Sequence, residues 1–270
     1  MHLRETLTGV RWWRVMVVLA CLAFVVAACS HVPLTGRRQL LLVSEADEIQ
    51  LGITEYKDVL AKSTLSKDEA TTERIRTIGS RIAAATGKAD YKWEFNLIQA
   101  DTVVNAFCLP GGKVAVYTGI KKVAATDDEL ATVMSHEISH AVARHGGERM
   151  SQLLLVQLGG VALDEALKTK TERTLELAQV AYGMGTTLAL VLPYSRAQES
   201  EADYMGLIFQ AKAGYDPRAA LDFWQKMEKE FAGKEPPQFL STHPSNAKRI
   251  EDIKAAIPEA MKYYQPSGKK

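Results

Sequence analysis

Apolar residues recur at helical spacing through most of this 270-residue chain, and only short stretches alternate as β-strands do. The clearest helical window runs from 127 to 145. Its apolar positions form one stripe: Leu130, Val133, Met134, Ile138, Ala141 and Val142. Three acidic residues occupy the first turn, at 127–129, where the helix dipole favours negative charge. The pattern predicts a helix from Asp127 to His145.

Further helices are predicted on both sides of this window. Ser44 caps a helix at 44–62, Gly87 ends one at 68–86, and a long helical stretch covers 148–192. Pro193, Pro217 and Pro244 each precede another helix. The strands are few: 93–99 alternates apolar and polar positions, and 103–109 and 114–117 flank a Pro-Gly-Gly turn. We therefore expect an α+β fold that is mostly helical, with a small β-sheet.

The first candidate chemistry lies inside the central helix, in the sequence His136-Glu137-Ile138-Ser139-His140. Residues four apart share a helix face, so both imidazoles can bind one Zn²⁺ with Glu137 beside the open coordination position. Zinc lowers the pKa of a bound water, and the glutamate takes its proton. The alternative is a core helix with two hydrogen-bonded histidines. Three of the six histidines fall within ten residues here, which favours the metal site.

A catalytic zinc ion normally takes three protein ligands. The metzincin spacing fails, because Ala143 and Gly146 stand where glycine and histidine are required. The helix after 193 offers carboxylates instead: Glu199 and Asp203 share one face, whereas Glu201 points nearly opposite. We predict Glu199 as the third ligand and Asp203 as the acceptor for a ligating histidine's ring N–H. Glu201 remains the alternative ligand, and a solvated acidic face is the ordinary interpretation of such a charge run.

These motifs, in this order, resemble the gluzincin metallopeptidase family of HtpX and the CAAX prenyl endopeptidase. The matching stretches are 136–140, the Ser-Arg-x-x-Glu-x-x-x-Asp run at 195–203, Thr242-His243-Pro244, and shorter ones at 35–40, 105–112 and 249–250. The layout is similar to the soluble bacterial lipoprotein or periplasmic branch that includes LoiP and BepA. The resemblance spans roughly residues 33–253. It implies a zincin-like metalloprotease domain with one Zn²⁺ per chain.

The same resemblance suggests a substrate-binding strand edge at Asn105, Ala106 and Phe107, bordering the active-site cleft. An extended peptide can add to such an edge through backbone hydrogen bonds. The turn residues alone favour an ordinary hairpin, and only the family resemblance favours the substrate edge. Cys108 departs from the family pattern, which has a small or apolar residue there, and it would put a free thiol near the cleft.

His243 is the remaining chemical candidate, since family members have a similarly placed histidine that approaches the zinc. It would either fill the fourth coordination position at rest or stabilise the oxyanion during attack. Arg249, six residues on, would either support His243 or be a surface charge. Otherwise His243 only precedes the helix that Pro244 opens. His145, at the end of the central helix, is interpreted as a favourable charge at a helix C-terminus.

The N-terminus carries Arg4, Arg11 and Arg14 before an apolar run at 15–28, too short for a membrane span of about 20 residues. The small residues before Cys29 resemble a bacterial lipobox, in which this cysteine is acylated. Cys21 has only a short apolar run before it, and an ordinary signal peptide or an uncleaved anchor is the alternative. By resemblance to enterobacterial sorting, we expect the periplasmic face of the outer membrane.

The predicted organisation is a lipoprotein signal peptide at 1–28, a lipid-anchored tether at 29–43, a metallopeptidase domain at 44–264 and a disordered tail at 265–270. Removal of the signal leaves Cys108 without a disulfide partner. It also takes away three arginines and one glutamate, so the net charge changes from +1 to −1. This charge argues against a nucleic-acid partner.

The apolar segment 175–192 has two interpretations. Two glycines and a glutamate within it argue against a membrane span. We expect a buried hairpin or lid over the active site, packed on 153–167, with oligomer or membrane contact as the alternatives.

Together these features predict a zinc endopeptidase of the bacterial cell envelope that hydrolyses peptide bonds of misfolded or envelope proteins, with Glu137 as general base. Its partners would be polypeptide substrates and, through the lipid, a membrane; an oligomer is possible. The rival is an envelope chaperone or assembly factor with a structural zinc site. The retained Glu137 favours the enzyme, and a membrane-embedded protease would need long apolar spans that are missing from the sequence.

Overall fold

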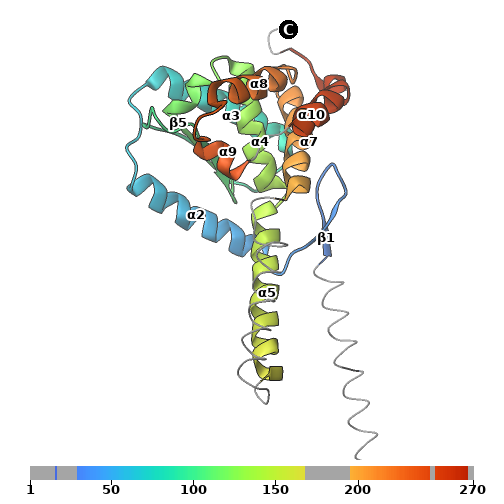
Figure 1. The fold of residues 1–270 in the computed structure, drawn as a ribbon. Coiled ribbons are helices and arrows are strands. Elements are labelled where there is room, and N and C mark those ends of the chain that lie inside the picture. The colour runs from blue at the N-terminus through green and yellow to red at the C-terminus, as the bar shows by residue number, and fades with distance from the viewer. Residues whose placement is uncertain (1–15, 17–28, 168–194, 244–246, 267–270) are drawn as a thin grey trace, which may run out of the picture.

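The computed structural model describes residue 16 and residues 29–167, 195–243 and 247–266. This part is mostly helical with two small sheets, so the predicted α+β class is confirmed (Figure 1). The helices are α2 (Glu45–Ala61), α3 (Glu69–Thr86), α4 (Asp127–Val142), α5 (His145–Leu167), α7 (Arg196–Lys212), α8 (Ala219–Phe231), α9 (Gln238–Thr242) and α10 (Ala247–Ala260), with 3-10 turns η1 (Thr118–Lys122) and η3 (Met261–Tyr263). The segment 175–192 and nearly all of the predicted signal peptide lie outside the described residues, as does most of the expected tail.

Helix α4 is the centre of the fold. Thr126 and Glu129 form a capping box at its start, in which each side chain accepts a hydrogen bond from the other residue's backbone N–H. Every residue from Glu129 to Val142 is buried. Helices α3, α7 and α8 and strand β4 (Ala106–Leu109) pack around it. The sequence predicted that α4 buries only its apolar stripe. In the structure the polar face is buried too, because α7 and α8 cover the side that carries the histidines.

Helix α7 approaches α4 closely at His136. Ser195 and Gln198 cap its start in the same reciprocal way. Gly206 makes the close approach possible, since a Cβ at this position would lie 3.2 Å from the backbone nitrogen of His136. Glu199 and Asp203 precede Gly206 by two turns and one turn, so the same contact directs both carboxylates at the helix that carries His136 and His140.

Three strands form the main sheet in the order β3 (Glu94–Ile98), β5 (Lys113–Tyr117), β4, with β3 parallel and β4 antiparallel to β5. The predicted Pro-Gly-Gly turn joins β4 to β5, and both glycines adopt left-handed backbone angles, φ 82° at Gly111 and φ 81° at Gly112. Strand β4 is thus an edge strand of this sheet, and it lies against α4.

The segment 29–43 is more structured than the extended tether predicted for it. Strand β1 (Cys29–His31) pairs antiparallel with β2 (Arg38–Leu40), and the turn between them reverses through Leu34 at φ 66° and Gly36 at φ 67°. Side chains of this hairpin reach the helices: the buried Gln39 donates a hydrogen bond to the carbonyl of Ala143. The tether prediction missed these long-range polar contacts, because only the fold brings their partners together.

The predicted 127–145 helix ends at Val142, earlier than expected. Arg144 adopts φ 58°, and this left-handed residue turns the chain before α5 begins at His145. Helix α5 projects away from the body in Figure 1 and exposes several leucines, among them Leu153, Leu154 and Leu158. Within the described ranges, no helix combines the length and apolar content needed to cross a membrane.

Candidate metal centre and active site

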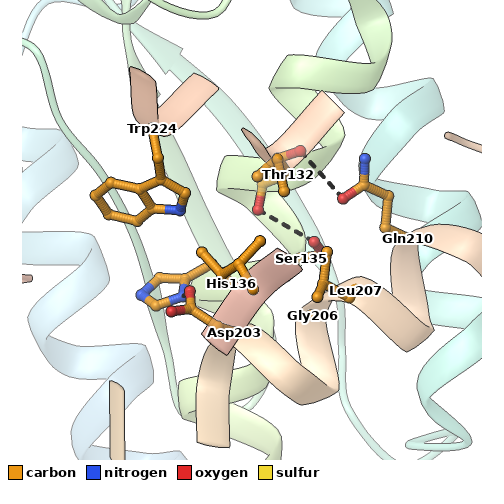
Figure 2. A pocket seen from close by; sticks show the side chains of 10 residues that line it. Thr132, Ser135, His136, Asp203, Gly206, Leu207, Gln210 and Trp224 are labelled. Carbon is orange, nitrogen blue, oxygen red and sulfur yellow. Dashed lines mark hydrogen bonds and ion pairs between the residues drawn. The ribbon is translucent and has the colours of Figure 1, made fainter. Parts of the chain in front are cut away.

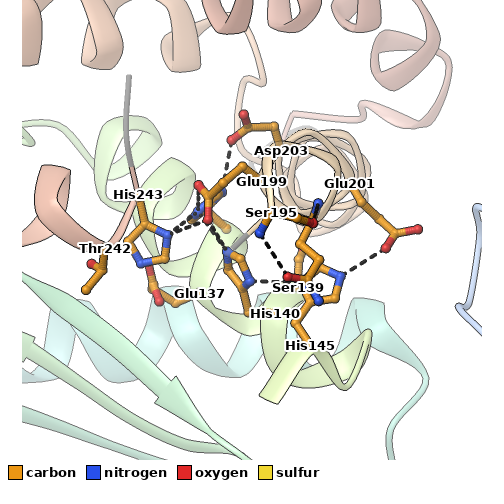
Figure 3. Close-up of polar contacts among 12 residues, drawn as sticks. Glu137, Ser139, His140, His145, Ser195, Glu199, Glu201, Asp203, Thr242 and His243 are labelled. Atoms are coloured by element: carbon orange, nitrogen blue, oxygen red, sulfur yellow. Dashed lines mark hydrogen bonds and ion pairs between the residues drawn. The ribbon is translucent and has the colours of Figure 1, made fainter. Parts of the chain in front are cut away.

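Four buried side chains converge between α4, α7 and the end of α9. His136 and His140 come from α4, Glu199 from the first turn of α7, and His243 directly follows α9. One ligand atom from each lies within 4.8 Å of the others. Figure 3 shows His140, Glu199 and His243 of this group pointing toward one another. Sequence analysis predicted the first three as ligands and His243 as a neighbour of the metal, and the fold brings all four together.

The spacing of these donor atoms fits one zinc ion. His136 Nε2 lies 3.1 Å from His140 Nε2 and 3.2 Å from His243 Nδ1, and Glu199 Oε1 lies 3.0 Å from His243 Nδ1 and 3.4 Å from His140 Nε2. Donors about 2.0–2.2 Å from a tetrahedral ion are themselves about 3.3–3.6 Å apart. Three imidazoles and a carboxylate are also a donor set that zinc accepts. The chain therefore holds a group suited to one zinc ion.

Glu137 lies beside this group without belonging to it. Its Oε1 atom is 3.4 Å from His243 Nε2, is fully buried, and has no hydrogen bond from the described residues. Burial raises the pKa of the Glu137 carboxyl above its usual value, although the nearby His243 and His136 partly oppose that shift. A buried carboxylate with a raised pKa is suited to accept a proton near neutral pH.

Asp203 contacts the second ring nitrogen of His136, Nδ1, and Arg249 binds Asp203 in turn. Asp203 Oδ1 lies 2.9 Å from His136 Nδ1, so the ring donates there and leaves Nε2 directed at the donor group. Arg249 binds the same carboxylate through two bonds of 2.7 and 2.9 Å and approaches Glu199 Oε2 at 3.0 Å. Burial opposes the ionised form of Asp203, but Arg249 and His136 outweigh it and lower its pKa to about 2.

The Trp224 side chain stacks on the guanidinium of Arg249. The guanidinium carbon of Arg249 lies 3.7 Å from the centre of a Trp224 ring, a cation–π distance. Figure 2 shows Trp224 on one side of the His136 ring and Asp203 on the other, in the narrow pocket between α4 and α7. Since Arg249 is buried, this stacking replaces water around the guanidinium while its nitrogens bind Asp203 and Glu199.

Glu201, the alternative third ligand, points away from the donor group (Figure 3). Its carboxylate binds His145 Nε2 at 2.9 Å and Arg37 Nε at 2.8 Å, and it also accepts a hydrogen bond from the Thr35 hydroxyl. Burial raises the pKa of Glu201, but these three donors outweigh it and lower the pKa to about 2. Two residues correspond to more than half a helical turn, which is why Glu199 and Glu201 face opposite sides.

The interpretation of His145 as a charge at a helix C-terminus is wrong. His145 is the first residue of α5, is fully buried, and places its Nδ1 atom 2.8 Å from Nδ1 of His140. Arg37, from the N-terminal hairpin, binds the same Glu201 carboxylate and was also absent from the predicted site. The one signal in the sequence was the clustering of three histidines within ten residues, because the turn at Arg144 that aims the ring is not visible in the pattern.

The predicted substrate edge is divided between two faces of the sheet. Ala106 and Cys108 pack toward the α4 core, whereas Phe107 packs with Tyr56 and Tyr117. Burial and the nearby Glu137 carboxylate raise the pKa of the Cys108 thiol. Asn105 is buried, and its carbonyl accepts a hydrogen bond from the backbone of Tyr117. The Phe107 side chain is therefore not brought to the donor group, since alternate residues of a strand point to opposite faces.

The sequence model of Peptidase family M48 matches residues 69–257, which include all four donors and Glu137. The chain belongs to peptidase family M48. This confirms the metallopeptidase and gluzincin predictions and makes the protein a member of a metalloendopeptidase family.

This M48 peptidase is similar to curated mitochondrial and bacterial relatives. It is 36% identical over 239 residues to the mitochondrial metalloendopeptidase OMA1 of Schizosaccharomyces pombe, covering 86% of this chain and 67% of the relative. It is 31% identical to the mitochondrial metalloendopeptidase OMA1 of Bos taurus over 268 residues, 93% of this chain and 51% of the relative. Identity to the beta-barrel assembly-enhancing protease of Yersinia pestis is 29% over 211 residues, 77% of this chain and 41% of the relative.

These comparisons overturn the predicted location at the periplasmic face of the outer membrane. Both of these mitochondrial relatives match this M48 peptidase with higher identity and over more of its length than the Yersinia beta-barrel assembly-enhancing protease does. The lipobox resemblance and the soluble-branch layout were the grounds for that location. Neither identifies a compartment, because the lipobox resemblance rests on a few small residues before one cysteine and the layout rests mainly on motifs around the metal site.

Proposed function

We propose that this M48 peptidase cleaves internal peptide bonds of polypeptides, with His136, His140 and Glu199 as zinc ligands and Glu137 as general base. The convergence of the donor atoms within 4.8 Å, beside a buried carboxylate of raised pKa, is the observation that supports it. Zinc bound there would supply a water of lowered pKa and polarise the substrate carbonyl. Glu137 then takes the proton of the attacking water and passes it to the leaving amine nitrogen.

The other residues prepare the ligands for this reaction. Asp203 accepts the His136 Nδ1 proton, which leaves the Nε2 lone pair for the metal. Arg249 neutralises part of the charge of Asp203 and Glu199, which would otherwise repel each other in a buried site. A substrate in extended form would bind along β4, whose backbone is paired on one side by β5. Asn105, Ala106 and Phe107 would lie along this edge, and Ala106 would offer its backbone N–H and C=O to the substrate. Asn105 already pairs with Tyr117, and alternate residues of an antiparallel pair turn these groups outward.

The position of His243 suggests how the enzyme is kept inactive before substrate binds. With His243 Nδ1 in the donor group, the metal would have four protein ligands, which is also the composition of a purely structural zinc site. Glu137 distinguishes the two functions, since a structural site gains nothing from a buried carboxylate 3.4 Å from the fourth ligand. We therefore propose that His243 occupies the fourth position at rest and leaves it when substrate binds.

The ligand assignment is tested by counting zinc in the purified chain. One equivalent is expected, removable by chelation together with casein cleavage and restored by added zinc. Glu199→Ala is expected to lose tight zinc binding. The matched variant Glu201→Ala should keep one equivalent at saturating zinc, with affinity lowered by about 10–100-fold at most, because Glu201 acts only through other residues. Tight binding in Glu199→Ala, or its complete loss in Glu201→Ala alone, would contradict the assignment.

Acylation of Cys29 remains a proposal about membrane attachment alone. Its support is the apolar run at 15–28 followed by small residues and the cysteine. Cys29 begins β1 and is paired with Leu40, so a lipid there would be attached directly to the folded hairpin. The mass of the mature protein tests this: an N-terminus at residue 29 carrying acyl chains is expected, and an unmodified Cys29 would end the proposal.

A further inference from the structure

We propose that His145, held by Glu201 and through it by the N-terminal hairpin, is the positioning residue for the metal ligand His140. This inference rests on the proposed function, because it assumes that His140 binds zinc. It adds a connection that begins at the ligand, and Figure 3 shows its inner part, His140, His145 and Glu201. From Glu201 the connection continues to Thr35 and Arg37, more than 100 positions away from His140 in the sequence.

The ring orientation of His140 is the first step. Its Nε2 atom faces the other donors, 3.1 Å from His136 Nε2 and 3.4 Å from Glu199 Oε1. A ligating Nε2 uses its lone pair for the metal, so the ring proton is on Nδ1. That Nδ1 lies 2.8 Å from His145 Nδ1. His145 therefore accepts the hydrogen bond that fixes the plane of the His140 ring.

The second step follows from the first. Once His145 Nδ1 accepts, the proton of its neutral ring must be on Nε2. That nitrogen lies 2.9 Å from Glu201 Oε2, where a carboxylate can only accept. The chain of donors thus has one consistent direction, from His140 through His145 to Glu201. Metal-ligating histidines in general give their second N–H to a carboxylate or carbonyl; here a second histidine is interposed.

The third step connects this chain to the N-terminal hairpin. Glu201 accepts hydrogen bonds from Thr35 and from Arg37 Nε, the latter at 2.8 Å. The two terminal nitrogens of Arg37 bind both oxygens of Glu148 on α5, each at 2.8 Å. Arg37 therefore connects α5, which carries His145, to α7, which carries Glu199 and Glu201. A bidentate pair of this kind fixes direction as well as distance.

The backbone supports the same arrangement. Arg144, at φ 58°, makes the sharp turn that returns His145 toward His140. Its guanidinium is held by Glu48 and by the carbonyl of Val43. A left-handed arginine costs free energy, so its surroundings must over-determine it. The turn and the hairpin thus both act to place one imidazole against the metal ligand.

Two substitutions of His145 separate positioning from packing. Asparagine puts its side-chain oxygen near the place of Nδ1, so His145→Asn can still accept from His140. Glutamine puts its amide nitrogen near the place of Nε2, so His145→Gln can still donate to Glu201 but not accept from His140 in the same way. We expect zinc affinity, measured by competition with a chelator, to fall about 10–100-fold in His145→Gln and His145→Ala, and to recover most of this in His145→Asn.

Cobalt provides a readout that does not depend on activity. In the Co²⁺-loaded full-length protein, the visible absorption bands report ligand geometry, and they should shift in His145→Gln while remaining near wild type in His145→Asn. Arg37→Ala should weaken zinc binding several-fold. The matched control Arg38→Ala, an exposed neighbour in β2, should not.

Each outcome bears on a different statement. Wild-type protein that binds no zinc would remove the proposed function itself. If wild type binds one zinc ion but His145→Gln and Arg37→Ala have unchanged affinity and unchanged cobalt spectra, the positioning role is wrong and the zinc site remains. Equal losses in His145→Asn and His145→Gln would also reject it, since packing alone would then account for the effect. If His145→Ala does not fold, the difference in zinc affinity between His145→Asn and His145→Gln still tests the positioning role.

Discussion

Glu137→Gln is expected to keep one zinc ion per chain and to lose peptide hydrolysis. Glutamine preserves the shape of the side chain but cannot take a proton from the attacking water. The carboxylate is buried beside the donor group and is not one of its four members, so the metal should bind as before. General-base catalysis contributes about 10²–10⁴-fold, so turnover of casein or a quenched peptide should fall by at least that factor.

The matched control for this variant is Glu228→Gln, which makes the same change at an exposed position on α8. It should leave both turnover and zinc content unchanged. Thermal unfolding of Glu137→Gln should show no loss of stability, because the substitution removes a buried carboxylate that lacks hydrogen-bond donors at Oε1 among the described residues. Cleavage at the wild-type rate in a variant that holds one zinc ion would rule out Glu137 as the base.

His243→Ala is expected to raise basal proteolysis, including self-cleavage. The imidazole Nδ1 lies within the donor group. If it fills the fourth position at rest, as proposed, it competes with the catalytic water and the open form is the minor state. Minor states are commonly populated at about 0.1–10%, and removal of the competing ligand should therefore raise turnover by about 10–10³-fold. The alternative role is stabilisation of the oxyanion, and loss of that donor would lower turnover by about 10²–10³-fold.

The sign of the His243 effect therefore identifies the role, measured as initial rates at saturating zinc. His31→Ala, at an exposed position of β1, is the control that should change nothing. The double variant Glu137→Gln/His243→Ala should be inactive, which would show that the increased activity uses the same base. Wild-type turnover and zinc affinity in His243→Ala would show that this residue has no role in catalysis and only caps the C-terminus of α9.

The chain sequence alone determined those parts of the site that depend on local helix geometry. His136 and His140 share a face because residues four apart do so in any α-helix. The preference for Glu199 over Glu201 followed from the same rule, and the structure points Glu201 away from the donor group. The caps at Ser44 and Gly87 were visible for the same reason, since each acts on backbone groups within a few residues.

Contacts between residues far apart in the sequence could be predicted only from the resemblance to the family. The sequence placed His243 near the metal because family members share the Thr-His-Pro stretch, but nothing in the spacing brings residue 243 to residue 136. Helix α9, which ends at that position, is five residues long and gives too weak a periodicity to predict. The location prediction was wrong because a short N-terminal pattern and a motif set common to the family do not identify a compartment.

Tertiary structure alone decided how the ligands are supported. The turn at Arg144 ends α4 early and aims His145 at His140, and the Arg144 side chain is held by hydrogen bonds to Glu48 and to the carbonyl of Val43. Arg37 joins Glu148 and Glu201, which are 111 and 164 positions away in sequence. Gly206 allows α7 to approach His136. Helix geometry is set by neighbouring residues and so can be inferred from them; contacts between distant segments exist only once the chain has folded, and their partners leave no periodic signal in the sequence.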